Sequence, residues 1–201
     1  MPGLDVVVLG GAAMDRVAEV CQLPAKDTVV LAWSDRSFPG GSAANVAVAL
    51  ARLGQRTGFV GKVGDDLNGV RLVDAFRDDG VNTSALIVEQ GSITATCFIA
   101  VDPNGERSIV AFPGASLIES TNELDATYIG SARVLYVGPA FPDVAQAAMN
   151  AIHNVKGTVF YAPSGAWGQD GLAGISRLVQ QADVMLLSQT EAAVLAGSSD
   201  P

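Results

Sequence analysis

A glycine pair, with an asparagine close behind it, is the first feature of this sequence that could bind a small polar ligand. Gly40 and Gly41 precede a segment with helical periodicity, and Asn45 falls in its first turn. Glycine has no Cβ, so a ligand can approach its backbone closely, and the first turn of a helix leaves N–H groups free. The amide of Asn45 adds a donor and an acceptor. Such a corner suits a hydroxyl-rich or anionic ligand, although an ordinary loop–helix–strand connection would contain the same residues.

The elements that position this corner follow from the spacing of apolar residues. Intervals of three and four residues predict a helix with one apolar face, made by Ala43, Val46, Ala47, Leu50 and Leu53. Ser42 or a neighbouring residue could cap this helix, and Gly54 is expected to end it in a left-handed conformation. The short apolar run from Thr57 to Val63 then predicts a buried strand.

Seven residues of this region stand at the spacing of a known signature. Within 25 residues these are Gly40, Gly41, Ala43, Asn45, Ala47, Gly54 and Gly64. The pattern resembles the N-terminal signature of the pfkB, or ribokinase-like, carbohydrate kinases. The resemblance implies ATP-dependent phosphorylation of a hydroxyl group on a sugar or a related polyol. It also implies a three-layer αβα, Rossmann-like fold whose sheet is mostly parallel and carries a small β-lid.

The resemblance further implies which side chains contact the sugar. Family members bind sugar hydroxyls with an aspartate that follows a glycine near the end of the first strand, and Asp15 matches it after the strand-like run Leu4 to Leu9. Gly40, Gly41 and Asn45 would complete the site. One carboxylate can accept from two vicinal hydroxyls, so Asp15 could recognise a diol. A lone aspartate at a strand end is also a common turn former or helix cap.

Two pairs of extended segments predict hairpins. Met14 to Leu23 alternates between apolar and polar residues, and Thr28 to Trp33 is β-branched and apolar, with a turn between them near residues 24–26. Thr94 to Val101 and Arg107 to Phe112 flank an Asn-Gly dipeptide, which is the strongest short hairpin signal.

Two hairpins inserted into a βα series are expected to pair with each other and form a lid over the sugar corner, at about residues 14–35 and 94–112. The resemblance implies the same lid, which in the family often serves as a homodimer contact. Arg107 could reach an anionic group of the substrate from this lid. It could equally be a solvated charge on a hairpin.

Strand and helix patterns alternate in the rest of the chain, which predicts a parallel sheet with helices on both faces. Asp65 and Asp66 are expected to cap a helix over Leu67 to Arg77 rather than to bind a metal. The region from Val81 to Val88 predicts a further strand. After the second hairpin, the expected strands are Val134–Val137, Thr158–Tyr161 and Val184–Leu187, and the expected helices are Val144–Ile152, Leu172–Gln180 and Gln189–Leu195.

Ser188 and Glu191 occupy the place of an Asn-x-x-Glu element that organises Mg²⁺ and phosphate in the family. The resemblance therefore implies ATP and Mg²⁺ as cofactors, with Ser188 at the nucleotide and Glu191 at the metal. Ser188 replaces the asparagine of the pattern. The alternative is a helix start with an acidic residue in its first turn.

Composition excludes several classes of protein. The net charge of −9 disfavours nucleic acid and anionic membrane surfaces as partners, and no apolar run reaches the ~18 residues of a membrane span. A single histidine excludes a metal site built on several histidines. Cys21 and Cys97 are isolated and are expected to be reduced, which together with the lack of a signal-peptide pattern favours a cytoplasmic protein.

The second signature of the family, D-T-x-G-A-G-D, does not occur in the 201 residues. It supplies the base and the anion hole for phosphoryl transfer, so no catalytic residue is assigned in this chain. We expect residues 1–201 to form one incomplete ribokinase-like domain, the N-terminal part of a sugar kinase that is inactive alone. A non-catalytic sugar- or nucleoside-binding module and a structural or dimerisation protein are the alternatives.

Overall fold

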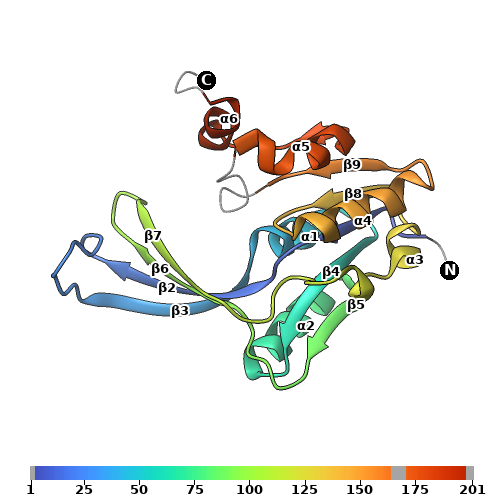
Figure 1. The fold of residues 1–201 in the computed structure, drawn as a ribbon. Coiled ribbons are helices and arrows are strands. Elements are labelled where there is room, and N and C mark those ends of the chain that lie inside the picture. Colours follow the sequence, from blue (N-terminus) through green and yellow to red (C-terminus); the bar gives the residue numbers. More distant parts are fainter. Residues whose placement is uncertain (1–2, 164–170, 198–201) are drawn as a thin grey trace.

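The protein consists of a main α/β body and a smaller sheet that projects from it (Figure 1). The computed structural model describes residues 3–163 and 171–197. Among these residues, no helix combines the length and the apolar character that crossing a membrane requires.

The main body contains a six-stranded parallel sheet in the order β10-β9-β8-β1-β4-β5. β1 pairs with β4 on one side and with β8 on the other. The strands are β1 (Val6–Leu9), β4 (Thr57–Gly64), β5 (Asn82–Glu89), β8 (Val134–Val137), β9 (Thr158–Tyr161) and β10 (Val184–Met185).

Helices cover both faces of this sheet, as a central strand that is apolar and buried along its whole length, such as β1, requires. In β1, Val6 and Val8 face one core cluster while Val7 and Leu9 face another. The first cluster lies under α1 (Ser42–Arg52) and α2 (Leu67–Asp78). The second lies under α3 (Ala126–Ile129), α4 (Pro142–His153) and α5 (Gly171–Gln181), and α6 (Gln189–Ala196) packs on α5. The predicted three-layer αβα fold is confirmed.

The projecting sheet has four strands in the order β3-β2-β6-β7 and is called the lid below. Its strands are β2 (Ala13–Val20), β3 (Ala32–Gly40), β6 (Thr96–Val101) and β7 (Arg107–Phe112). β2 and β6 run parallel and join the two hairpins along the middle of the sheet. Both hairpins therefore exist and pair with each other, as the sequence predicts.

The second lid strand starts later than its sequence pattern predicts. A strand was expected over Thr28–Trp33, but β3 begins at Ala32 and continues to Gly40. The hydroxyl of Thr28 exchanges hydrogen bonds with the backbone of Ala25, at 2.9 and 3.0 Å, so Thr28 belongs to the turn. The strand continues to Gly40 because Phe38 and Gly40 pair with Asp15 and Ala13 of β2.

Most helix boundaries agree with the sequence pattern. Gly54 follows α1 with φ +85°, and Asp66 caps α2 by accepting a hydrogen bond from the Gly69 N–H at 2.9 Å. The N-cap of α1 is Gly41, the neighbour of Ser42, and no side chain caps this helix. Two short elements were not predicted from the sequence, the 3₁₀-helix η1 (Thr121–Glu123) and α3.

Candidate functional site

The chain changes direction across the sheet between β1 and β8, and the start of α1 lies at this point. From β1 the chain proceeds toward β4 and β5, whereas from β8 it proceeds toward β9 and β10. Ligands of open α/β sheets bind beyond the carboxyl ends of strands at such a switch. Gly10 ends β1 here, and a Cβ on it would lie 2.6 Å from the Cβ of Ala43 in α1.

Gly41 lies between the main body and the lid, where its backbone passes so close to Gly11 and Ala12 that no Cβ would fit. Its φ is +99°, and a Cβ would lie 2.8 Å from both the Cα of Ala12 and the carbonyl oxygen of Gly11. The N–H of Ala44, in the first turn of α1, donates to that same carbonyl at 3.4 Å. Part of the space and hydrogen-bonding capacity expected for a ligand is therefore used by the protein's own backbone.

Gly40 provides space for the side chain of Asp15. An ideal Cβ on Gly40 would stand 2.1 Å from Oδ2 of Asp15. Asp15 lies on β2, and its register partner on the neighbouring strand β3 is Phe38. The carboxylate thus leans over the backbone of the neighbouring strand at the base of the lid, beside the turn into α1.

Asp15 has a second polar neighbour that the sequence analysis did not assign to the site. Cys97 of β6 stands directly beside it in the parallel β2–β6 pairing, which places the thiol next to the carboxylate. Burial raises the pKa of Asp15, and the Cys97 hydrogen bond partly opposes the rise. Burial and the nearby Asp15 charge together raise the pKa of Cys97. The sequence contained no signal for this pair, because strand register is not visible in alternation alone.

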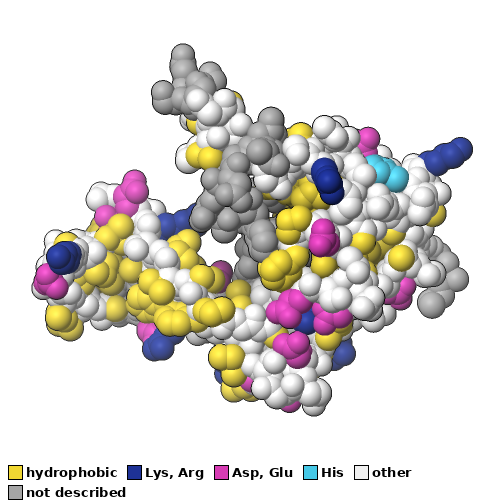
Figure 2. Space-filling model, viewed as in Figure 1, with side chains coloured by type: hydrophobic (Ala, Val, Ile, Leu, Met, Phe, Trp, Pro, Cys, Tyr) yellow, Lys and Arg dark blue, Asp and Glu magenta, His cyan; other side chains and the backbone are white. Residues whose placement is uncertain are grey.

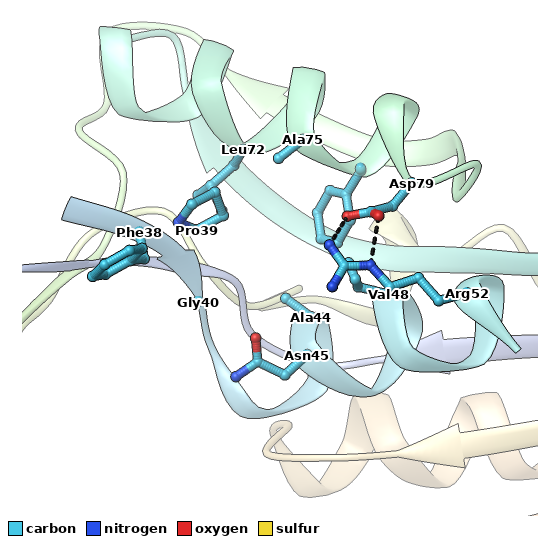
Figure 3. A pocket seen from close by; sticks show the side chains of 11 residues that line it. Phe38, Pro39, Gly40, Ala44, Asn45, Val48, Arg52, Leu72, Ala75 and Asp79 are labelled. Carbon is cyan, nitrogen blue, oxygen red and sulfur yellow. Dashed lines mark hydrogen bonds and ion pairs between the residues drawn. The ribbon is translucent and has the colours of Figure 1, made fainter.

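Asn45 and Gly40 line a cavity of about 330 Å³ between α1, α2 and the end of β3 (Figure 3). Apolar side chains form most of its wall, and the remaining lining residues are Phe38, Pro39, Ala44, Val48, Arg52, Leu72, Ala75, Phe76 and Asp79. Arg52 binds Asp79 through two hydrogen bonds of 2.6 and 2.9 Å at the end opposite Gly40. Asp15 and Gly41 are not among the lining residues. The side chain of Asn45 is exposed, so its amide is open to solvent next to the corner.

Arg107 lies on the lid but far from Asp15. It pairs with Val101, four residues beyond the Cys97 that stands beside Asp15. Residues in register share a face, so Arg107 and Asp15 are on the same face of the lid. Four strand positions correspond to about 13 Å along the sheet. Arg107 therefore does not join the corner formed by Asp15, Gly40 and Asn45.

Ser188 and Glu191 form a capping box at the start of α6. The Ser188 N–H donates to the Glu191 carboxylate at 2.8 Å, and the Glu191 N–H donates to the Ser188 hydroxyl at 3.2 Å. The charge of Glu191 also contributes, after burial, to the raised pKa of Tyr136 on β8. The described residues contain no group of three or more His, Cys, Asp or Glu side chains that could hold a metal ion. Helix capping, the alternative considered above, is what these two residues do here.

Thr94 connects the lid to the helix cap of α2. Its hydroxyl donates to Asp66 Oδ1 at 2.5 Å and accepts from the Gly64 N–H at 3.0 Å, and Thr94 is buried. Burial alone would raise the pKa of Asp66, but hydrogen bonds from Thr94 and Gly69 outweigh it and lower the pKa. Asp66 is thus a helix cap, as predicted, and also an anchor for the chain that enters β6.

Lys62 is a buried charge that the sequence analysis also missed. Its side chain is 2% exposed, and its amino group lies 2.7 Å from Glu123 and 3.1 Å from Glu89, with Glu119 at 3.9 Å. Burial would lower the pKa of Lys62, but Glu123 and Glu89 outweigh it and raise the pKa. The cluster ties β4 and β5 to the segment that returns from the lid, and it is occupied by its own charges rather than open to a ligand.

Comparison with known proteins identifies the family of this chain. The family model for "pfkB family carbohydrate kinase" matches residues 4–201. The chain belongs to this family. The resemblance inferred from the glycine signature is therefore confirmed.

The matching curated relatives are sugar kinases. A probable fructokinase-6 of Arabidopsis thaliana is 33% identical over 135 residues, which cover 66% of this chain and 34% of that protein. A 5-dehydro-2-deoxygluconokinase of Shouchella clausii is 36% identical over 136 residues, covering 66% of this chain and 40% of that protein. The matched regions thus span about a third to two fifths of these two relatives.

Solved ribokinases share the fold. Ribokinase of Arabidopsis thaliana, in complex with ribose and ATP, superposes with a TM-score of 0.80 at 22% identity over 99% of this chain and 65% of that one. Ribokinase of Cryptococcus neoformans, in complex with ADP, gives a TM-score of 0.85 at 20% identity, over 99% and 62%. The likeness supports the ribokinase-like fold of both the main body and the lid.

Proposed function

We propose that this chain forms the sugar-binding part of an ATP-dependent carbohydrate kinase, which transfers a phosphoryl group to a hydroxyl of a sugar or related polyol. Membership of the pfkB family and the kinase names of its relatives support this class of reaction. The chain covers less than two thirds of these relatives, so the activity of the whole protein is part of the proposal.

The observation that carries the proposal is the position of Asp15 at the base of the lid. Its carboxylate lies over Gly40, beside the turn from β3 into α1, at the switch point of the sheet. Asp15 would accept hydrogen bonds from two neighbouring hydroxyls, while Asn45 would donate to or accept from a third. Gly40 and Gly41 would keep the backbone of this corner close to the ligand.

ATP and Mg²⁺ are the proposed cofactors. Related structures were solved with ATP and with ADP, which supports a nucleotide as the phosphoryl donor. Ser188 would contribute to the nucleotide site, and Glu191 would act on Mg²⁺ through water with the carboxylate oxygen that the capping box leaves free. Bound Mg²⁺ would neutralise charge that develops on the transferred phosphoryl group.

The proposed partners are a small-molecule sugar or nucleoside and a second copy of the chain. The acidic sequence disfavours nucleic-acid and membrane partners, and the two free cysteines support the proposed cytoplasmic location. Figure 2 shows hydrophobic side chains gathered over the lid. Those of Phe98, Val110 and Phe112 are more than a third exposed and lie on the face opposite Asp15, which suits a homodimer contact.

The test is a calorimetric titration of the chain with hexoses, pentoses and nucleosides. We expect one class of ligand to bind, and Asp15→Ala to weaken it by roughly tenfold to a hundredfold, since a hydrogen bond to a charged group contributes about 1.5–3 kcal/mol. Asn45→Ala should show a smaller loss. Equal affinity in Asp15→Ala and the parent would refute the assigned sugar corner.

A second assay concerns phosphoryl transfer. Transfer needs a base beside the accepting hydroxyl and donors facing the phosphate. The motif that supplies them in the family is not among these 201 residues. We expect no sugar-dependent ADP release from the purified chain with ATP and Mg²⁺, and release from a version extended through a D-T-x-G-A-G-D segment. Release by the 201-residue chain, with its mass verified, would contradict this part of the proposal.

A further inference from the structure

Cys97 and Asp15 form a side-chain pair at the seam of the lid. They are register partners on the parallel strands β6 and β2, the pairing that joins the two hairpins. Register partners point to the same face of a sheet. Cys97 is half-buried, so its thiol is held in place by its surroundings rather than free in solvent.

The carboxylate of Asp15 is confined on both sides of β2. On the β3 side it rests on the backbone of Gly40, where no side chain can hold it. On the β6 side Cys97 is its register partner, which places the thiol beside the carboxylate. Gly40 offers only contact surface and Phe38, the register partner on β3, carries no polar group, so Cys97 is the polar side chain next to the carboxylate in the lid pairing.

The protonation states suit this role. Burial and the charge of Asp15 raise the pKa of Cys97, so the thiol keeps its proton at neutral pH and can donate it in a hydrogen bond. Other charged groups on this face lie further out: Glu19 is four residues along β2 and pairs with Arg36 at 3.1 Å, and Arg107 stands at the far end of β7. The pKa of Asp15 responds to burial and to Cys97.

We propose that Cys97 is a positioning residue for substrate binding: its thiol donates to Asp15 and holds the carboxylate over Gly40 in the orientation that accepts the sugar hydroxyls. The sugar-binding half of this inference rests on the proposed function. The thiol–carboxylate contact stands independently of it.

The first experiment measures the contact itself in the 201-residue chain. Iodoacetamide alkylates the thiolate: once the thiol has lost its proton to the buffer, sulfur displaces iodide and forms a thioether. Labelling of Cys97 and Cys21 is followed by peptide mass spectrometry from pH 6 to 10. In the parent, labelling of Cys97 should require a pH above the ordinary pKa of a free thiol, because burial and Asp15 raise its pKa, and the exposed Cys21 serves as the internal reference for the reagent.

Replacing the charge should shift only one of the two profiles. In Asp15→Asn, the Cys97 profile should move to lower pH while the Cys21 profile stays in place, because a carboxylate charge no longer opposes thiolate formation. Glu19→Gln, which removes a carboxylate from the same strand and face, is the matched control and should leave both profiles unchanged. Identical Cys97 profiles in the parent and Asp15→Asn would overturn the inference.

The second experiment measures positioning through sugar affinity. Cys97→Ala should weaken binding about two- to tenfold, the range of one neutral hydrogen bond. Cys97→Ser keeps a donor and should retain most of the affinity, which a purely structural role would not predict. Equal affinity in Cys97→Ala and the parent would refute positioning. A parent that binds no sugar would refute the proposed function instead, and the labelling profiles would still decide whether Cys97 holds Asp15.

Discussion

The carboxylate of Asp15 occupies the space that a Cβ at residue 40 would fill, so glycine at this position leaves room for it. Oδ2 of Asp15 lies 2.1 Å from the point where a Cβ of residue 40 would stand. Gly41 needs its positive φ of +99°, but Gly40 is not among the glycines with positive φ, so its requirement is steric. The two glycines of the pair are therefore needed for different physical reasons in this chain. Gly41 fits where two backbone segments cross, and Gly40 makes room for the Asp15 carboxylate.

Gly40→Ala is expected to displace the Asp15 carboxylate and to weaken sugar binding by about tenfold or more, because a misplaced charged acceptor loses its hydrogen bonds. The free energy of unfolding should change little, because the clash is with the far end of the Asp15 side chain, which can move aside. Calorimetry and urea unfolding measure the two effects. Gly130→Ala is the control, since a Cβ there would stand 3.2 Å from its nearest neighbour, in a helical backbone conformation. Unchanged affinity in Gly40→Ala would contradict the steric argument.

Asp15→Asn should separate binding from stability. Burial raises the pKa of Asp15 above its ordinary 3.8, although the Cys97 hydrogen bond opposes part of the rise. The folded state therefore binds this proton more tightly than the unfolded chain does, and stability falls as pH rises from 3.8 through the folded pKa. Asp15→Asn should thus be at least as stable as the parent at pH 7, with the difference vanishing below pH 3.8, while sugar binding is weakened. Urea unfolding from pH 3 to 7 measures this, and a less stable variant at pH 7 would contradict it.

Lys62→Met should destabilise the fold by about 1–3 kcal/mol at pH 7, because it leaves the carboxylates around Lys62 without their shared cation. The loss is kept modest since Glu89 and Glu123 are each about a third exposed. Lys26→Met, at an exposed lid position, is the control and should have little effect.

The same cluster predicts a pH dependence. Burial would raise the pKa of Glu123, but the Lys62 hydrogen bond and two backbone N–H groups lower it below 4.5, and Ser92 and Lys62 lower that of Glu89. Their stabilising contribution is present above pH 4.5 and is lost as pH falls through the folded pKa values. Lys62→Met should therefore flatten the acid side of the stability profile. An equally steep loss in parent and variant would refute the role of this cluster.

Thr94→Val should loosen the attachment of the lid. The change leaves the Gly64 N–H and a carboxylate oxygen of Asp66 without their hydroxyl partner, which should cost about 1–3 kcal/mol. Hydrogen exchange should then accelerate in β6 and at the start of α2. Thr96→Val, two residues along the chain, is the control. Unchanged exchange in both segments would refute the anchoring role of Thr94.

Association through the lid can be tested on its outer face. Val110→Ser should weaken a homodimer, whereas Val155→Ser, at the opposite end of the main sheet from the lid, should not, although the two valines are 52% and 51% exposed. Sedimentation over a range of concentrations measures the effect. A parent chain that sediments as a monomer at all concentrations would contradict the proposed dimer.

Elements that depend only on residues close together in the sequence could be predicted well. The α1 pattern and the Asp66 cap needed only neighbouring residues, and both are found. The start of β3 was wrong because Thr28 resembles a strand residue but its hydroxyl closes a turn on Ala25. Tertiary context decided that position.

The candidate site was only partly predictable. The glycine signature located Asp15 and Asn45 along the chain, but their environment depends on register and packing. The contact between Asp15 and Cys97 joins residues 82 positions apart, and the burial of Lys62 depends on a segment that returns about sixty residues later. Alternation does not specify such pairings.

The parallel seam between β2 and β6 also has a consequence for the order of folding. β2 precedes α1 in the sequence, whereas its partner β6 follows α1, β4, α2 and β5. A pairing with so large a sequence separation incurs its loop-closure entropy before it gains contacts. In the folded structure the hydrogen bond between Thr94 and Asp66 fixes the entry to β6 on the main body. We therefore expect the seam, and with it the corner at Asp15, to form late, after the main-body elements that separate β2 from β6 in the sequence.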